Sequence, residues 1–156
     1  MIGRMANLSH IFHRFSLICF VFATSLLQSA EAPAAGGRPI RALLITGGCY
    51  HNYQFQSDAM TNAIGKVVPV VWTILREDCT GSSKKEIDLY NDPNWAKPFD
   101  IIIHNECFAD TDNPEYVRKI TAAHQAGKPA MVIHCAMHTY RAAKFDDWRE
   151  FLGVTS

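Results

Sequence analysis

The chain has 156 residues, of which 48% are apolar, 11% aromatic and 19% charged, a composition typical of a globular domain with a core. Its 15 lysines and arginines balance its 15 aspartates and glutamates, and like charges never run beyond adjacent pairs such as Lys84-Lys85. This balance excludes the basic patch that nucleic acids or anionic membranes require, so neither is expected as a partner.

The first residues have the organisation of a secretory leader. Arg4 and Arg14 belong to a basic region, residues 15–27 are apolar or small, and Ala30-Glu31-Ala32 fits the small-x-small cleavage pattern. The apolar stretch of 13 residues is shorter than the ~20 residues that a helix needs to cross a bilayer. We therefore predict a signal peptide over residues 1–32 and a secreted or periplasmic protein that has no membrane contact after cleavage.

A flexible linker is expected over residues 33–39, followed by one domain over residues 40–156. Continuous apolar runs predict buried strands, and apolar residues at helical spacing predict helices. The predicted strands cover residues 40–46, 67–75, 99–104 and 129–134. The predicted helices cover residues 52–66, 112–127 and 145–152, with a short helical turn near residues 83–89 and a loop over residues 135–143.

Strands and helices therefore alternate along the chain, which predicts an α/β fold with a doubly wound parallel sheet and right-handed crossovers. Pro69 indicates that the second strand begins late or lies at an edge. Only four strands are visible, so we expect the domain to be truncated at its C-terminus. An unpaired sheet edge would favour self-association, and a homo-oligomer is a possible consequence.

Polar residues gather where three of these strands end. Ligands bind beyond the carboxyl ends of parallel strands, so residues 47–51, 104–107 and 134–141 should converge. These segments hold all the histidines that follow the leader except His124. Gly47 and Gly48 permit positive φ and a close approach of backbone N–H groups to a ligand, although no third glycine completes a dinucleotide-binding motif. The pattern predicts a functional site at this edge.

Two chemistries fit these residues. In the first, Cys135 is a thiolate nucleophile with His134 or His138 as its base, although its bulky neighbours differ from the small residues of a nucleophile elbow. In the second, His51, His134 and His138, with Glu106, bind a divalent metal or act as general acid and base on a polyhydroxylated substrate. Structural alternatives remain open: strand-end histidines often bond a neighbouring loop, and free cysteines are often small buried apolar residues.

The cysteines allow a further alternative. Cys49, Cys79, Cys107 and Cys135 follow the leader, an even number that permits three disulfide pairings in an exported protein. Three of the four directly follow predicted strands, where site residues collect. The pattern therefore favours site cysteines over a structural disulfide.

Several motifs resemble the ThuA-like, or trehalose-utilisation, family. They are RALLITGG (41–48), His51-Asn52-Tyr53, FDIIIHNEC (99–107) and GKPAMVIHCAMHTYR (127–141), followed by Trp148 and Gly153. The resemblance implies a flavodoxin-like fold of the class I glutamine amidotransferase-like superfamily. It also implies a role in carbohydrate catabolism, with a disaccharide or keto-sugar as substrate and an isomerase or hydrolase-like activity.

The resemblance also assigns residues. It implies a catalytic set of His51, His134, His138, Glu106 and Cys135. Tyr50, Tyr140 and Trp148 offer flat faces to a sugar ring, and the expected substrate-binding set is Gly47, Gly48, Tyr50, Asn105, Tyr140, Arg141 and Trp148. The amidotransferase relatives hold their cysteine in a Gly-x-Cys-x-Gly setting that Cys135 lacks, so glutaminase activity is not implied. A non-catalytic carbohydrate-binding module and an inactive fragment remain the alternatives, and no cofactor other than a divalent metal is suggested.

Overall fold

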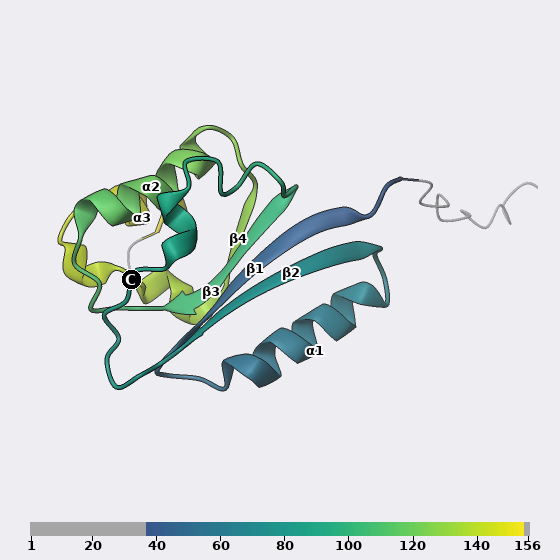
Figure 1. Cartoon of the computed structure of the whole chain (residues 1–156), viewed down its shortest axis with the longest axis horizontal. Coiled ribbons are helices and arrows are strands. Elements are labelled where there is room, and N and C mark those ends of the chain that lie inside the picture. Colours follow the sequence, from purple (N-terminus) through teal and green to yellow (C-terminus); the bar gives the residue numbers. More distant parts are fainter. Residues whose placement is uncertain (1–36, 155–156) are drawn as a thin grey trace, which may run out of the picture. The chain divides into compact units, whose positions relative to one another are not determined.

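The computed structural model describes residues 37–154. The predicted signal peptide, residues 1–32, lies outside the described residues. Within them, four parallel strands form one sheet in the order β2-β1-β3-β4 (Figure 1). The strands are β1 (Ile40–Gly48), β2 (Val70–Asp78), β3 (Ile101–Cys107) and β4 (Ala130–Val132). This order is that of flavodoxin-like doubly wound sheets, which confirms the predicted fold class.

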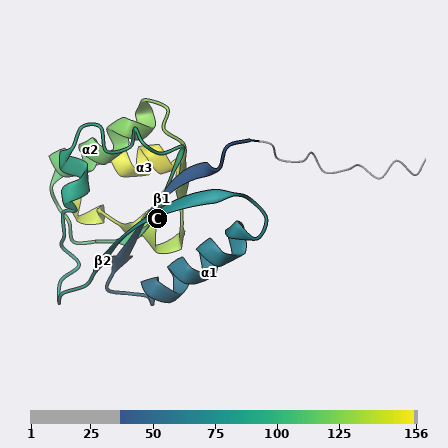
Figure 2. The same cartoon turned by 45° about the vertical axis from the view of Figure 1, so that its right-hand side comes forward.

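Helices cover the two faces of this sheet. The helix α1 (Tyr53–Gly65) lies on one face, and α2 (Pro114–Gln125) and α3 (Asp147–Leu152) lie on the other (Figures 1 and 2). The side chain of Asn52 caps α1 by accepting a 3.0 Å hydrogen bond from the Phe55 N–H. Asn113 caps α2 in the same way, and Pro114 occupies its first turn. Both helix starts agree with the sequence.

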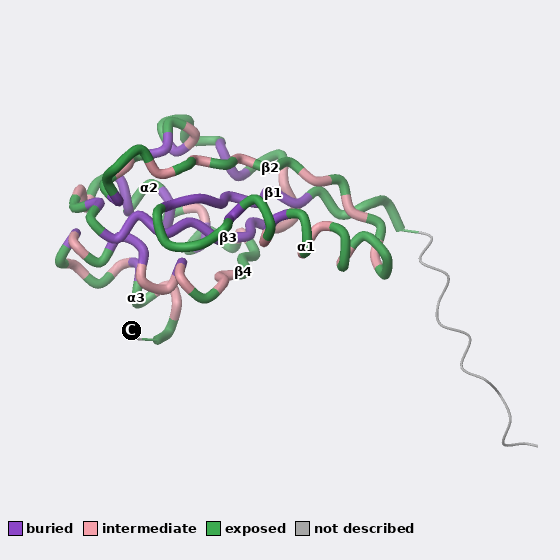
Figure 3. Tube along the Cα trace, turned by 90° about the horizontal axis from the view of Figure 1, so that it is seen from below, coloured by how far each residue is buried: buried purple, intermediate pink, exposed green. Residues whose placement is uncertain are grey.

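Burial follows the central strands. Buried residues run along β1 and β3, whereas much of α1 and β2 is exposed (Figure 3). The larger core joins Leu43 and Ile45 of β1 to Val117 and Ile120 of α2. A smaller core, which includes Leu44, lies on the α1 face. Both faces of the central strands are covered, as expected for a parallel sheet.

The alternation of side chains along β3 divides its polar end between the two faces. Ile102 belongs to the core beneath α2 and α3, and Ile103 belongs to the core beneath α1. Because successive side chains point to opposite faces, His104 and Glu106 follow Ile102, while Asn105 and Cys107 follow Ile103. This division decides which strand-end residues can share a site.

Several boundaries differ from the sequence-based prediction. β2 begins after Pro69 as expected and is an edge strand, but it extends to Asp78 because its polar end still pairs with β1. The short helical turn is a 3-10 helix, η1 (Asp88–Asn91), later than predicted. Ser83 and Lys85 are instead held by hydrogen bonds to Asp110 and Thr111.

The chain after β3 also differs. β4 ends at Val132, two residues early, because His134 has a φ of 34° and leaves the extended conformation. The predicted loop over residues 135–143 contains two 3-10 helices, η2 (His134–His138) and η3 (Arg141–Ala143). Among residues 37–154, no helix combines the length and apolar character needed to cross a membrane.

Candidate functional site

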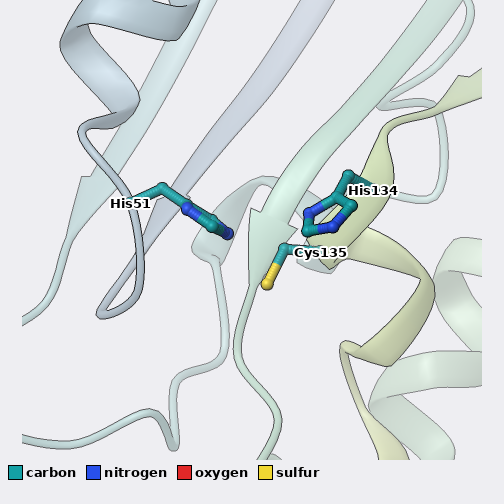
Figure 4. Close-up of side chains that lie close together, drawn as sticks. All are labelled: His51, His134 and Cys135. Atoms are coloured by element: carbon teal, nitrogen blue, oxygen red, sulfur yellow. The ribbon is translucent and has the colours of Figure 1, made fainter.

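His51, His134 and Cys135 lie together where β1 and β4 end. One donor atom from each, a ring nitrogen of either histidine and the Cys135 sulfur, lies within 4.8 Å of the other two. The two imidazole rings are 5.6 Å apart between centroids. Figure 4 shows the ring of His51 pointing across the strand ends toward the other two side chains. We call these three residues the strand-end cluster.

Local backbone structure positions the cluster. His51 lies in the loop between β1 and α1, next to the cap residue Asn52. His134 begins η2 with a φ of 34°, in the left-handed region that residues other than glycine and asparagine rarely adopt. Such strained residues persist only where the surrounding structure holds them, and they concentrate at functional sites.

A disulfide supports the loop that carries His51. Cys49 and Cys79 are bonded across a sequence separation of 30 residues, with their Cα atoms 4.9 Å apart. They directly follow Gly48 and Asp78, which pair in the ladder between β1 and β2. The expectation that the cysteines are site residues rather than a structural bridge is therefore wrong for this pair, because the ladder brings both to the same level.

A small hollow adjoins the cluster. Its volume is about 150 Å³, and Tyr50, Cys107, Ala109, Cys135, His138 and Arg141 line it. Tyr50 is 52% exposed, so its ring is available to a ligand. Hollows of about 410 and 350 Å³ lie elsewhere, near Pro93 and Ala126, and neither is lined by a histidine or a cysteine. The hollow beside the cluster is therefore the better candidate for chemistry.

Two buried groups lie behind the cluster. Cys107 is 1% exposed, and burial, together with a hydrogen bond involving Cys135, raises the pKa of its thiol to about 12. The thiol of Cys107 is thus neutral near pH 7, unlike an activated nucleophile. The hydroxyl of Tyr53 is also buried, and it lies in hydrogen-bond contact with the backbone of Tyr50. Burial raises the pKa of Tyr53, so this hydroxyl keeps its proton.

Gly47 and Gly48 face neighbouring strands. A Cβ atom at Gly47 would lie 1.9 Å from the Glu77 carbonyl oxygen, and one at Gly48 would lie 2.5 Å from the Cys107 carbonyl oxygen. Their φ angles are 137° and 121°. The two glycines therefore allow β1 to approach β2 and β3 closely at this edge.

Asn105 is engaged within the fold. Its side-chain amide donates hydrogen bonds to the Thr46 hydroxyl at 3.2 Å and to the Gln56 side-chain oxygen at 3.1 Å. It ties β3 to β1 and to α1, and it is 3% exposed. Asn105 was expected to bind substrate, and the structure places it beneath the surface instead.

Glu106, expected in the catalytic set, lies on the opposite face of the sheet from Cys107. Its Oε1 accepts a 3.0 Å hydrogen bond from the Tyr140 hydroxyl and lies 2.8 Å from His104 Nδ1. The residue is fully buried. Tyr140 and Trp148, expected to stack on sugar, are also core residues, and Trp148 donates to the Ala136 carbonyl at 3.0 Å. The structure therefore does not bring these three residues to the cluster.

His104 continues this buried network to α2. His124 Nδ1 lies 2.9 Å from the Lys128 carbonyl oxygen and must donate to it, because a carbonyl only accepts. His124 Nε2 then accepts from His104 Nε2 at 3.0 Å. This leaves His104 Nδ1 and Glu106 Oε1 with one proton between them. Burial lowers the pKa of His124 to about 4, consistent with its neutral form.

His138 lines the hollow but is absent from the three-residue donor set. An i, i+4 pair shares one face of an α-helix. In a 3-10 helix, residues i and i+3 eclipse, so residue i+4 is turned away by about a third of a revolution. The third donor near His51 and His134 is therefore Cys135.

Cys107 was expected at the strand ends but outside the candidate catalytic and binding sets, and Tyr53 was noted only as part of the His51-Asn52-Tyr53 motif. The period-2 alternation of β3 would have placed Cys107 on the α1 face, opposite Glu106. The position of the Tyr53 hydroxyl depends on how α1 docks, for which the sequence carries no comparable signal.

The parallel sheet and its two helical layers define a flavodoxin-like α/β domain. No family profile and no curated protein matches the chain. Among solved structures it is similar to a protein from Parabacteroides merdae ATCC 43184 that is described as ThuA-like, with a TM-score of 0.51 and 20% sequence identity over 73% of this chain. The match covers 37% of that protein, so the chain spans a little over a third of its length. The resemblance to ThuA-like proteins is thus supported at the level of the fold.

Proposed function

We propose that the chain acts on a small carbohydrate, a disaccharide or a keto-sugar, at the strand-end cluster and its hollow. One observation carries this proposal: His51, His134 and Cys135, remote in sequence, meet beside a hollow where the parallel strands end. Ligands of doubly wound folds bind at this edge. The ThuA-like resemblance supports a carbohydrate as the substrate, and the geometry supports the strand ends as its binding place.

Acid–base chemistry suits this arrangement. His51 and His134 are both exposed, so substrate can reach their ring nitrogens. Imidazoles exchange protons near neutral pH, as isomerisation or hydrolysis of a sugar requires. Arg141 lines the hollow with a guanidinium group whose N–H groups can donate hydrogen bonds to sugar hydroxyls, and Tyr50 provides an aromatic face.

The size of the hollow limits the substrate. About 150 Å³ is well below the 300–1,000 Å³ of most small-molecule pockets. It suits a single sugar ring, so the second ring of a disaccharide would project into solvent.

The proposal includes export from the cytoplasm. The Cys49–Cys79 disulfide supports it, because disulfides persist in oxidising compartments and are rare in the cytosol. The predicted leader over residues 1–32 is the sequence feature in its favour.

The experiment is incubation of the purified chain with a panel of disaccharides and their 3-keto derivatives, followed by product analysis. His134→Asn removes the imidazole and keeps a residue that tolerates positive φ. We expect turnover of at least one sugar and its loss in this variant, with affinity largely retained. Binding without turnover would identify a carbohydrate-binding module. Absence of both would refute the proposal.

A matched aromatic pair tests the hollow. Tyr50→Ala should weaken sugar binding, whereas Phe55→Ala removes a ring that is 68% exposed on α1 but does not line the hollow. Equal effects of the two substitutions would argue against binding at this place.

A further inference from the structure

We propose that His51, His134 and Cys135 form a binding site for a borderline-soft transition-metal ion, Zn²⁺ by preference. The inference concerns the cluster described above but does not depend on the carbohydrate proposal, because metal binding is measured without any sugar. It also differs from the sequence-based suggestion of three histidines, since a thiolate replaces His138.

The donor separations suit one ion. Bonds of 2.0–2.1 Å from zinc to nitrogen and 2.3 Å to sulfur place tetrahedral donors about 3.3–3.6 Å apart. The three donor atoms lie within 4.8 Å of one another, so a contraction of about 1.5 Å at most closes the site. His51 and His134 are exposed, and small χ rotations of their rings supply this movement at little cost.

The fold holds all three ligands in place before an ion arrives. The Cys49–Cys79 disulfide anchors the loop of His51, two residues away. His134 and Cys135 are adjacent at the start of η2, where Ala136 N–H donates a 2.9 Å hydrogen bond to the Ile133 carbonyl. A site whose ligands are already gathered has less conformational entropy to lose on binding.

The donor chemistry selects the ion. Two imidazoles and one thiolate suit Zn²⁺, whereas Mg²⁺ and Ca²⁺ prefer oxygen ligands. The cluster contains no carboxylate. Binding takes the proton from the Cys135 thiol and releases it to solvent, because a metal-bound cysteine is a thiolate. Three protein ligands leave the fourth position open, as in catalytic rather than structural zinc sites.

The test is isothermal titration of the chelator-treated, full-length chain with ZnCl₂, without reductant so that the disulfide stays intact. The same titration is made in a Cys107→Ala background, where Cys135 has no neighbouring thiol with which to oxidise. We expect one zinc per chain, proton release on binding and no detectable binding of MgCl₂. Failure of Zn²⁺ to bind the folded Cys107→Ala protein would overturn the proposal.

Variants identify the ligands. His51→Ala, His134→Asn and Cys135→Ser should each weaken zinc binding by about 100-fold or more, beyond the 10–100-fold typical of residues that only support a ligand. His138→Ala is the matched control and should change affinity less than about threefold. With Co²⁺ as a spectroscopic probe, a thiolate-to-metal absorption band should appear and vanish in Cys135→Ser. Unchanged affinity in Cys135→Ser, or loss of binding in His138→Ala, would show that the site lies elsewhere.

Discussion

His124 is the residue whose environment gives the clearest pH signature. Its ring stacks on Phe151, with centroids 4.5 Å apart, and burial lowers its pKa to about 4. The surrounding groups are His104, Glu106 and Lys128. The rings of His104 and His124 belong to one hydrogen-bonded chain. Protonation of His124 would therefore place a charge in the core and remove the ring nitrogen that accepts the hydrogen bond from His104.

This environment predicts a loss of stability in mild acid. The folded pKa lies below the ordinary value of 6.5, so the unfolded state takes up the proton first as the pH falls. The contribution of neutral His124 to the free energy of unfolding is complete above pH 6.5 and is lost as the pH drops toward 4. It amounts to about 3 kcal/mol at most. Urea unfolding at pH 7, 5 and 4 should show a steeper decline for the natural chain than for His124→Gln. Parallel declines would contradict this assignment.

Gly48 gives a prediction about close packing. Gly48→Ala places a methyl group against the Cys107 carbonyl at a φ of 121°, and should destabilise the fold by about 3 kcal/mol or more. Gly81→Ala is the matched control, because its φ is also positive, at 95°, yet nothing lies within 4 Å of the new atom. It should cost about 1 kcal/mol. Denaturant midpoints measure both, and similar values would show that strand contact at Gly48 is unimportant.

At the scale of elements, the disulfide joins two neighbouring strand ends. It closes a segment of 30 residues, for which chain entropy predicts a stabilisation of about 3–4 kcal/mol. The double substitution Cys49→Ser with Cys79→Ser should lower the free energy of unfolding by about that amount. Cys135→Ser, which removes a half-buried free thiol, is the control and should have little effect. Equal losses would mean that the bridge does not constrain the chain.

The disulfide could not be predicted without the correct ends of β1 and β2. The sequence-based prediction ended β2 at Leu75, so Cys79 was expected in a long connection with no defined neighbour. The strand continues to Asp78, and Gly48 pairs with Asp78, so the following cysteines are level. Polar residues at a sheet edge have a weak propensity for strand structure, so the end of β2 is determined by its pairing with β1. The bridge could be predicted only after the register was known.

The candidate site was predicted in part for a similar reason. His51, His134 and Cys135 were expected near the strand ends, and the parallel sheet brings them there. Glu106 was expected with them, but alternation along β3 turns it to the other face. The 3-10 helix η2 separates His138 from His134, and its geometry depends on tertiary contacts such as that of Ile133 with His104. No local sequence pattern predicts such a turn.

At the scale of the whole described domain, the fold class followed from long apolar runs and helical spacing, which are strong signals. The sheet nevertheless has an open edge at β4, where Met131 is 45% exposed. Open edges invite pairing with another chain. We expect concentration-dependent self-association of this chain in sedimentation velocity.

Met131→Lys should reduce this association, because a charge on an edge strand opposes pairing. Phe55→Lys is the control, since Phe55 is exposed on α1 and away from the edge. If Phe55→Lys reduces association as strongly, nonspecific hydrophobic association rather than pairing at the β4 edge is responsible.

The central claim is that three side chains distant in sequence share one ligand at the strand ends. Zinc K-edge X-ray absorption of the zinc-loaded chain tests it most directly. We expect one sulfur near 2.3 Å and nitrogen or oxygen neighbours near 2.0 Å, with the sulfur shell lost in Cys135→Ser. A first shell of nitrogen and oxygen alone in the natural chain would contradict it.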